Sequence, residues 1–99
     1  MPSGKHVRPQ KWINVIDLYD DGVYSAIWGD YSNTGSCLGV RWNNEFGAVG
    51  YPNLGPNPTW YIEPPRIARM ILLDLCDRVI KKPEHGNLEN ILKALSQCP

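Results

Sequence analysis

The sequence has no excess of charge of either sign and no long hydrophobic run. Ten Lys and Arg balance ten Asp and Glu among 99 residues, which gives a formal net charge of zero. A chain without net charge lacks the positive field of typical nucleic-acid binders, and its copies repel one another little. No run approaches the roughly 18 apolar residues of a membrane span, since charges interrupt even the best candidate, 67–80. We therefore expect no membrane span, and we expect a homodimer or a protein partner.

Histidine and cysteine are also scarce. His6 and His85 are the only histidines, and neither lies at a hairpin or helical spacing from a cysteine, so the sequence predicts no zinc site. The cysteines are odd in number and widely spaced: Cys37, Cys76 and Cys98. The first ten residues contain no apolar stretch typical of a signal peptide. This pattern predicts a reduced, cytoplasmic protein whose thiols are core groups or bystanders, and no glycine-rich or metal-binding motif indicates a cofactor.

The chain divides into a short arm and one domain. Residues 1–10 contain two prolines and no regularly spaced apolar residues, so we expect a flexible arm. Residues 11–99 are expected to form a single α+β domain, because a period of two in the first half gives way to a helical period in the second.

The first half predicts an antiparallel meander. Strict alternation from Lys11 onward places Trp12, Asn14, Ile16 and Leu18 on one face of the first strand and Ile13, Val15 and Asp17 on the other. Asp20, Asp21 and Gly22 are typical of a hairpin turn. Further strands are predicted over 23–28, 37–42 and 46–51. A fifth strand over 59–62 would lie at the margin of the sheet, because prolines flank it.

The second half predicts two helices. Proline loses no helical hydrogen bond at the first position, so a helix is expected from about Pro65 to Lys82. Its apolar stripe comprises Ala68, Ile71, Leu72, Leu75 and Val79, flanked by Ile67, Met70 and Cys76. Asn87 is expected to cap a shorter helix with a stripe of Leu88, Ile91, Leu92 and Leu95. The predicted fold is a sheet of four to five strands with both C-terminal helices packed on one face.

Aromatic side chains are the most suggestive group for function. Many lie on the predicted strands or in the proline-rich segment 50–65, and helices on one face leave the other face of the sheet open. We expect an interaction or inhibitor module that uses this aromatic face and the proline-rich loop. The expected binding residues are Trp28, Arg41, Trp42, Tyr51, Leu54, Trp60 and Tyr61.

Two alternatives stay open. A single-stranded nucleic-acid binder would stack bases on the aromatic face, and it requires a continuous positive surface formed by Lys5, Arg8, Lys11 and Arg41. An enzyme would use an acidic site at the strand ends, formed by Asp17, Asp20 and Asp30. Asp and Asn also form turns without any catalytic role, and that explanation fits the Asp20–Gly22 segment better.

Overall fold

The computed structural model of the chain describes residues 12–31, 35–43, 53–54, 57–58 and 60–99. Within these residues, four strands form an antiparallel sheet in the order β1-β2-β3-β6: β1 Trp12–Asp20, β2 Tyr24–Tyr31, β3 Ser36–Trp42 and β6 Tyr61–Glu63. The two-residue strands β4 (Asn53–Leu54) and β5 (Asn57–Pro58) pair in the proline-rich segment. The predicted arm over 1–10 and the predicted strand over 46–51 lie outside the described residues.

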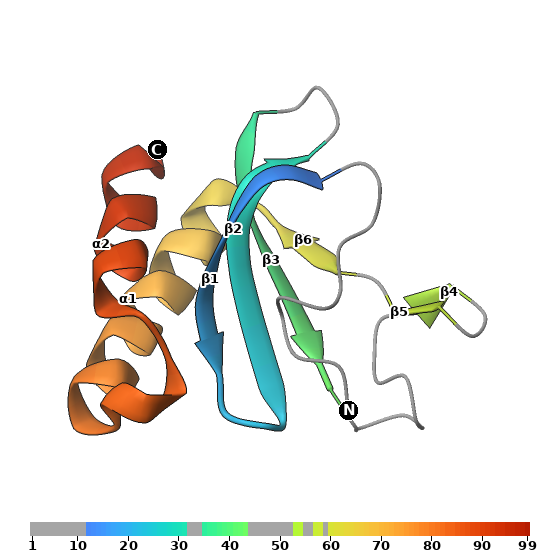
Figure 1. The fold of residues 1–99 in the computed structure, drawn as a ribbon. Coiled ribbons are helices and arrows are strands. Elements are labelled where there is room, and N and C mark those ends of the chain that lie inside the picture. Colours follow the sequence, from blue (N-terminus) through green and yellow to red (C-terminus); the bar gives the residue numbers. More distant parts are fainter. Residues whose placement is uncertain (1–11, 32–34, 44–52, 55–56, 59) are drawn as a thin grey trace.

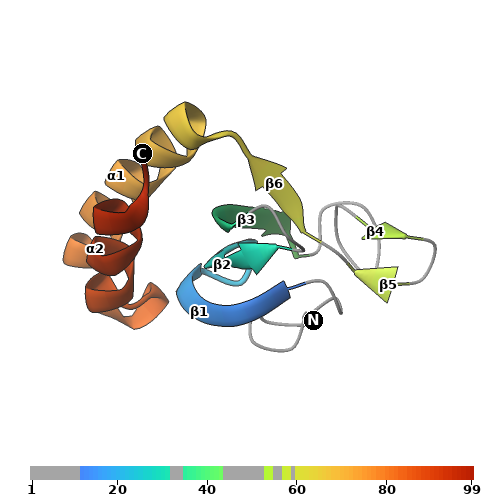
Figure 2. The same cartoon turned by 90° about the horizontal axis from the view of Figure 1, so that it is seen from above.

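Both helices follow the sheet and cover one of its faces, which confirms the predicted α+β class. They are α1 (Pro65–Lys81) and α2 (Leu88–Gln97), joined by the short 3-10 helix η2 (Pro83–His85). Pro65 is the first residue of α1, and the Asn87 side chain caps α2 by accepting a hydrogen bond from the Asn90 backbone N–H at 3.0 Å. Figure 2 shows the helices on one side of the sheet and β4 and β5 on the other, and Figure 1 gives the element order. No helix among the described residues combines the length and apolarity that a membrane crossing requires.

Strand β1 departs from the predicted alternation at two bulges. Ile13 pairs with Asp30 and Ile16 with Trp28, so three steps on β1 match two on β2. Asn14 lies inside this bulge with a φ of 54°, a conformation that Asn tolerates better than most residues. The extra residue reverses the faces, so Trp12 packs on the side of the sheet opposite Ile16 and Leu18. The predicted shared face for these three residues is therefore wrong.

The sheet carries a buried cluster on each face. The larger cluster lies under the helices and joins sheet residues such as Leu18, Trp28 and Leu38 to Leu72, Leu75 and Ile91 on the helices. The smaller cluster, on the opposite face, consists of Trp12, Ile27 and Trp60, with Val15, Tyr31 and Cys37 packed against it. The second face of the sheet is therefore partly core. On α2, Leu92 is exposed although the stripe pattern placed it with the buried residues.

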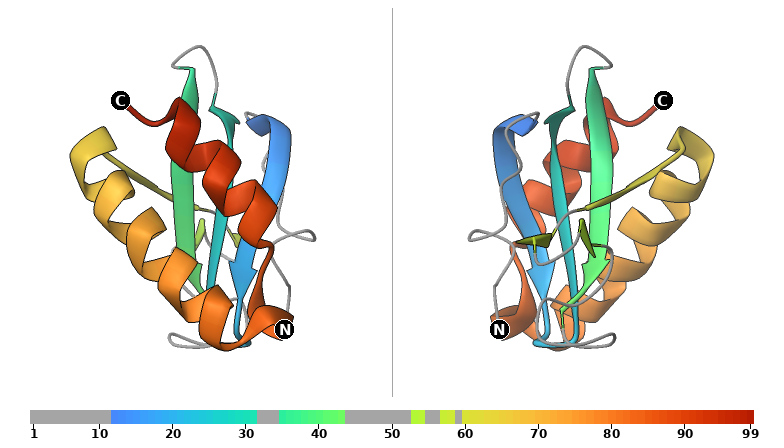
Figure 3. Two further views of the ribbon diagram at one scale, coloured as in Figure 1. Left: turned by 90° about the vertical axis from the view of Figure 1, so that its left-hand side faces the viewer. Right: turned by 90° about the vertical axis from the view of Figure 1, so that its right-hand side faces the viewer.

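The connection between the helices docks on the end of β1. Gly86 bridges to Tyr19, and the Asn87 backbone N–H donates to the Leu18 carbonyl oxygen at 3.0 Å. The Asn90 side chain donates to the Asp17 carbonyl oxygen at 2.9 Å. These bonds hold the C-terminal end of α1 near the β1–β2 turn, while both helices cross the sheet obliquely (Figure 3).

Candidate functional site

A groove of about 540 Å³ lies between α1 and the end of the sheet that carries the β1–β2 turn. Its walls are mainly apolar: Val23, Tyr24 and Trp42 on the sheet side, and Ile67, Met70, Ile71 and Leu75 on α1. Tyr19, Asp21, Asp74 and Arg78 add polar groups. This size and composition are those of typical ligand pockets, which are mostly apolar with a few convergent polar groups.

Aromatic rings form the sheet wall of the groove. Tyr24 and Trp42 are directly opposite on β2 and β3, and their rings meet edge to face with centroids 4.9 Å apart. Burial, assisted by the nearby carboxylates of Glu63 and Asp74, raises the pKa of Tyr24 to about 12. Tyr24 is therefore neutral at physiological pH, and this wall presents uncharged aromatic surface. Trp42 remains 42% exposed.

The wall beside the aromatic rings is the β1–β2 turn, which two aspartates stabilise. Asp20 accepts a hydrogen bond from the Gly22 N–H at 2.9 Å, and Gly22 has a φ of 92°. Asp21 accepts from the N–H groups of Val23 and Tyr24 at 2.9 and 2.8 Å. The turn explanation for Asp20 and Asp21 is thus supported in detail.

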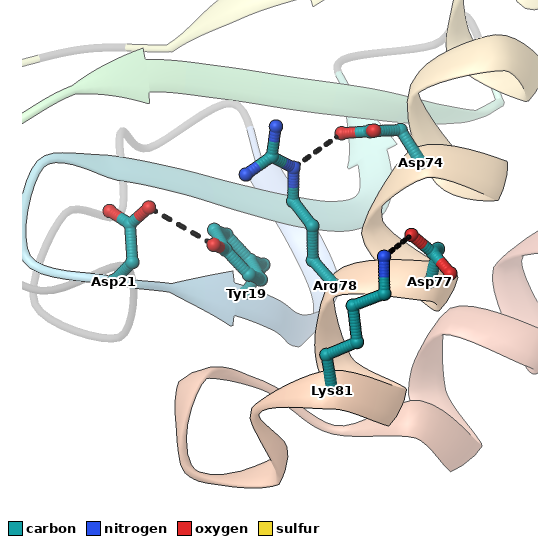
Figure 4. Close-up of polar contacts among 6 residues, drawn as sticks. All are labelled: Tyr19, Asp21, Asp74, Asp77, Arg78 and Lys81. Atoms are coloured by element: carbon teal, nitrogen blue, oxygen red, sulfur yellow. Dashed lines mark hydrogen bonds and ion pairs between the residues drawn. The ribbon is translucent and has the colours of Figure 1, made fainter.

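At the polar end of the groove, Tyr19 and Asp21 lie opposite Asp74 and Arg78 of α1. The Tyr19 hydroxyl donates to Asp21 at 3.0 Å, and Arg78 Nε donates to Asp74 at 2.7 Å (Figure 4). Figure 4 shows the Arg78 side chain reaching from α1 toward the strands. Partial burial acts to raise the pKa of Asp21, but hydrogen bonds from Tyr24, Val23 and Tyr19 outweigh it and lower the pKa. Asp21 is therefore ionised at neutral pH.

The expected binding residues fall into three groups. Trp28, Arg41 and Trp60 are buried, at 3%, 1% and 5% exposure, and so they form no exposed surface. Trp42 and Tyr61 are exposed. Tyr51 and the Leu54 side chain lie outside the described part of the structure. The buried members correct the expectation of an open aromatic face: Trp28 packs under the helices, where its indole N–H donates to Gln97 at 2.7 Å, and Trp60 belongs to the second core cluster.

Arg41 is part of a buried polar network on the face opposite the helices. Its Nε donates to the Asn43 side-chain oxygen at 3.4 Å, and the Asn43 amide donates to Ser25 at 2.7 Å and to Asp20 at 3.3 Å. The Arg41 guanidinium also lies over the Trp60 ring, 5.9 Å from its centroid. Hydrogen bonding satisfies these buried polar groups, as burial requires, so the network stabilises the sheet.

The acidic site expected at the strand ends does not form. Asp20 lies opposite Ser25 at one end of β2, whereas Asp30 lies near the other end and binds Asn14 and Ser36. Five residues of strand correspond to about 17 Å, which is too far for two carboxylates to share a proton or an ion. In the part of the chain that the structure describes, no three His, Cys, Asp or Glu side chains gather in a way that could hold a metal ion.

The positive surface required for nucleic-acid binding loses one of its four residues. Arg41 is buried, while Lys5, Arg8 and Lys11 lie outside the described residues. Fewer aromatic residues are available for base stacking as well, because Trp28 and Trp60 are core residues.

The cysteines lie in or beside the core. All three are free thiols, and Cys37 and Cys98 line a second cavity of about 450 Å³ near the start of α1. Burial raises the pKa of the Cys37 thiol, which disfavours the reactive thiolate. The Cys98 thiol lies 3.5 Å from the Pro65 carbonyl oxygen. These environments match the expectation of packing thiols.

Sequence reasoning missed the groove because its walls come from distant parts of the chain. The sequence pattern predicts Val23 in a strand and Ile67 and Met70 at the flanks of a core stripe, yet Val23 and Met70 are 50% and 66% exposed. An excess of apolar residues on α1 over those needed to cover one sheet face was the available signal. Comparison with protein-family models, curated proteins and solved structures finds no match for this chain.

Proposed function

We propose that the protein is an interaction module that binds an apolar segment of a partner protein in the groove between α1 and the β1–β2 turn. The observation that carries this proposal is the volume of about 540 Å³ behind walls of mainly apolar and aromatic side chains. Apolar side chains that protrude from a partner lose their contact with water in such a groove, and this loss is favourable at roughly 25 cal/mol per Å². Trp42 on one wall and Met70 on the other are residue types enriched in protein interfaces.

The charges at the rim of the groove indicate which charge the partner segment should carry. Asp21 and Asp74 contribute two negative charges and Arg78 one positive charge, so the polar end carries a net charge of −1. Arg78 is already bound to Asp74 through its Nε. A basic residue beside the apolar anchor complements this rim, whereas an acidic residue is repelled. The proposed ligand is therefore a segment with an aromatic or large aliphatic side chain next to Lys or Arg.

The other expected features of the module form part of the same proposal. Tyr61 on β6 and the proline-rich loop would extend the contact beyond the groove. An inhibitor would use the same groove to hold one apolar side chain of its target protein. The cytoplasm is the proposed location, because three free thiols suit a reducing compartment.

Selection of random peptides displayed on phage against the full chain tests the binding mode. We expect the enriched peptides to share an apolar anchor flanked by a basic residue. Val23→Lys introduces a charge on the groove wall, and we expect it to abolish peptide binding. Leu92→Lys is the matched control, because Leu92 is as exposed as Val23 but lies on α2, outside the groove.

Three results would contradict the proposal. The first is that no peptide is enriched; the second is that enriched peptides bind the Val23→Lys protein as well as the wild type. The third is that a single-stranded oligonucleotide quenches tryptophan fluorescence in a salt-sensitive way while the peptides do not, which would favour nucleic-acid binding.

A further inference from the structure

The outer side of helix α1 carries two exposed apolar residues between two charged ones. The buried residues of α1 are Ala68, Leu72, Leu75 and Val79. With 3.6 residues per turn, Arg66, Met70, Leu73 and Asp77 lie on the opposite side of the helix, in line along its axis. Met70 and Leu73 are 66% and 52% exposed, and Arg66 and Asp77 are exposed as well. We call these four residues the outer stripe.

The spacing of the outer stripe is that of a helix-pairing seam. Its residues are separated by four, three and four positions, which is the heptad pattern of residues that face a second helix. Ile80, three residues further on, continues the pattern and is also exposed. Packing against the protein's own core does not explain why apolar residues also occur at this spacing on the solvent side of α1.

The charges at the ends of the outer stripe are complementary to those of a second copy. In an antiparallel pair related by a two-fold axis, Met70 of one copy faces Leu73 of the other, and each Arg66 faces the other copy's Asp77. The two central layers are then apolar, and an ion pair closes each end. A parallel pair would instead place Arg66 against Arg66 and Asp77 against Asp77, which repel.

Asp77 is available for such a contact. It lies 3.0 Å from Lys81 within α1, and both side chains of this pair are mostly exposed, at 62% and 73% (Figure 4). A surface pair of this kind stabilises a helix little. The carboxylate can therefore accept a second cation from a neighbouring molecule without a large loss within its own helix.

We infer that the protein forms a two-fold homodimer through antiparallel pairing of the outer stripes of two α1 helices. This surface is distinct from the groove, although Met70 borders both. A seam of four residues per copy lies at the low end of interface sizes, so the dimer is expected to be weak, with a dissociation constant on the order of micromolar.

Sedimentation equilibrium of the full chain over a range of concentrations tests the dimer. We expect a reversible monomer–dimer equilibrium that Leu73→Lys shifts to monomer. Leu92→Lys is the matched control, since Leu92 is 51% exposed and lies on α2, and we expect it to dimerise like the wild type. Circular dichroism of both variants checks that they fold.

Charge reversal tests the pairing itself. Arg66→Asp and Asp77→Arg each place like charges at both ends of the seam, so each is expected to weaken dimerisation by about tenfold or more. The double variant restores opposite charges and is expected to recover most of the loss. A wild-type protein that stays monomeric at all concentrations, a dimer that Leu73→Lys does not affect, or a double variant no better than the single ones would overturn the inference.

Discussion

Replacing Gly86 by alanine tests how the helical layer is anchored to the sheet. A Cβ atom at this position would approach the Leu18 carbonyl oxygen and the Val79 side chain, and the closest approaches are 2.4 and 2.7 Å. The carbonyl belongs to the backbone, so it cannot rotate away as a side chain could. Gly86 has a φ of −168°, which alanine adopts without strain, so the cost arises from the clash alone.

The expected loss of stability follows from the movement of the backbone that relieves the clash. Relief of the clash separates the connection from β1 and weakens the hydrogen bond from the Asn87 N–H to the Leu18 carbonyl oxygen, now 3.0 Å long. Overpacking of this kind costs about 2 kcal/mol, and the melting temperature of a domain of this size should fall by about 10 °C. The free energy of unfolding is measured by urea denaturation, and hydrogen exchange reports whether the Asn87 amide loses protection.

Gly35→Ala is the control. No described atom lies within 4 Å of a Cβ there, and the cost comes from a φ of 83°, which L-residues avoid. We expect it to lower stability by about 1 kcal/mol without exposing the Asn87 amide. If Gly86→Ala were as stable as the wild type, or cost no more than Gly35→Ala with the Asn87 amide still protected, the proposed anchoring of the connection on β1 would be wrong.

Three further predictions concern buried and charged groups. Asp21→Asn should lower stability by about 1 kcal/mol at neutral pH. Because the folded pKa of Asp21 lies below its unfolded value, its contribution is complete above the unfolded pKa and is lost as pH falls through the folded pKa. The gap between wild type and variant in urea denaturation should therefore close at low pH, and a constant gap would contradict this assignment. Arg41→Ala should lower the free energy of unfolding by about 3 kcal/mol in the same assay. The substitution removes the Arg41 donor from the Asn43 side-chain oxygen and uncovers the Trp60 ring. A cost below that of an ordinary surface substitution would refute the structural role of Arg41. Trp12→Phe should cost less than Trp28→Phe, because the buried Trp12 indole N–H has no hydrogen-bond partner among the described residues, whereas that of Trp28 binds Gln97. The reverse order would show that the Trp12 N–H is satisfied.

Local signals in the sequence predicted the elements well. Pro65 begins α1 and Asn87 caps α2 because both effects act within one turn of helix. The Asp20–Gly22 turn was predictable for the same reason, since its hydrogen bonds join residues two or three positions apart. These features depend on the backbone near each residue and on little else.

Features that depend on distant contacts were not predictable. The bulge at Asn14 reverses the faces of β1, and nothing in an alternating pattern reveals one extra residue. Trp60 was expected on an exposed face, but it packs with Trp12 and Ile27 on strands far away in the sequence. The groove likewise needs the β1–β2 turn and α1 to meet, and the docking of Gly86 on Tyr19 brings the far end of α1 to that turn.

The most direct test of the groove as the binding site is an NMR titration of the full chain with an enriched peptide, observed at the methyl groups. Binding in the groove predicts shift changes and intermolecular contacts at Val23, Ile67 and Ile71, with little change at Ile13, Ile62 or Leu92, which lie outside it. Changes confined to Ile62, with the groove methyls unaffected, would place binding on the exposed edge of the sheet and contradict the account.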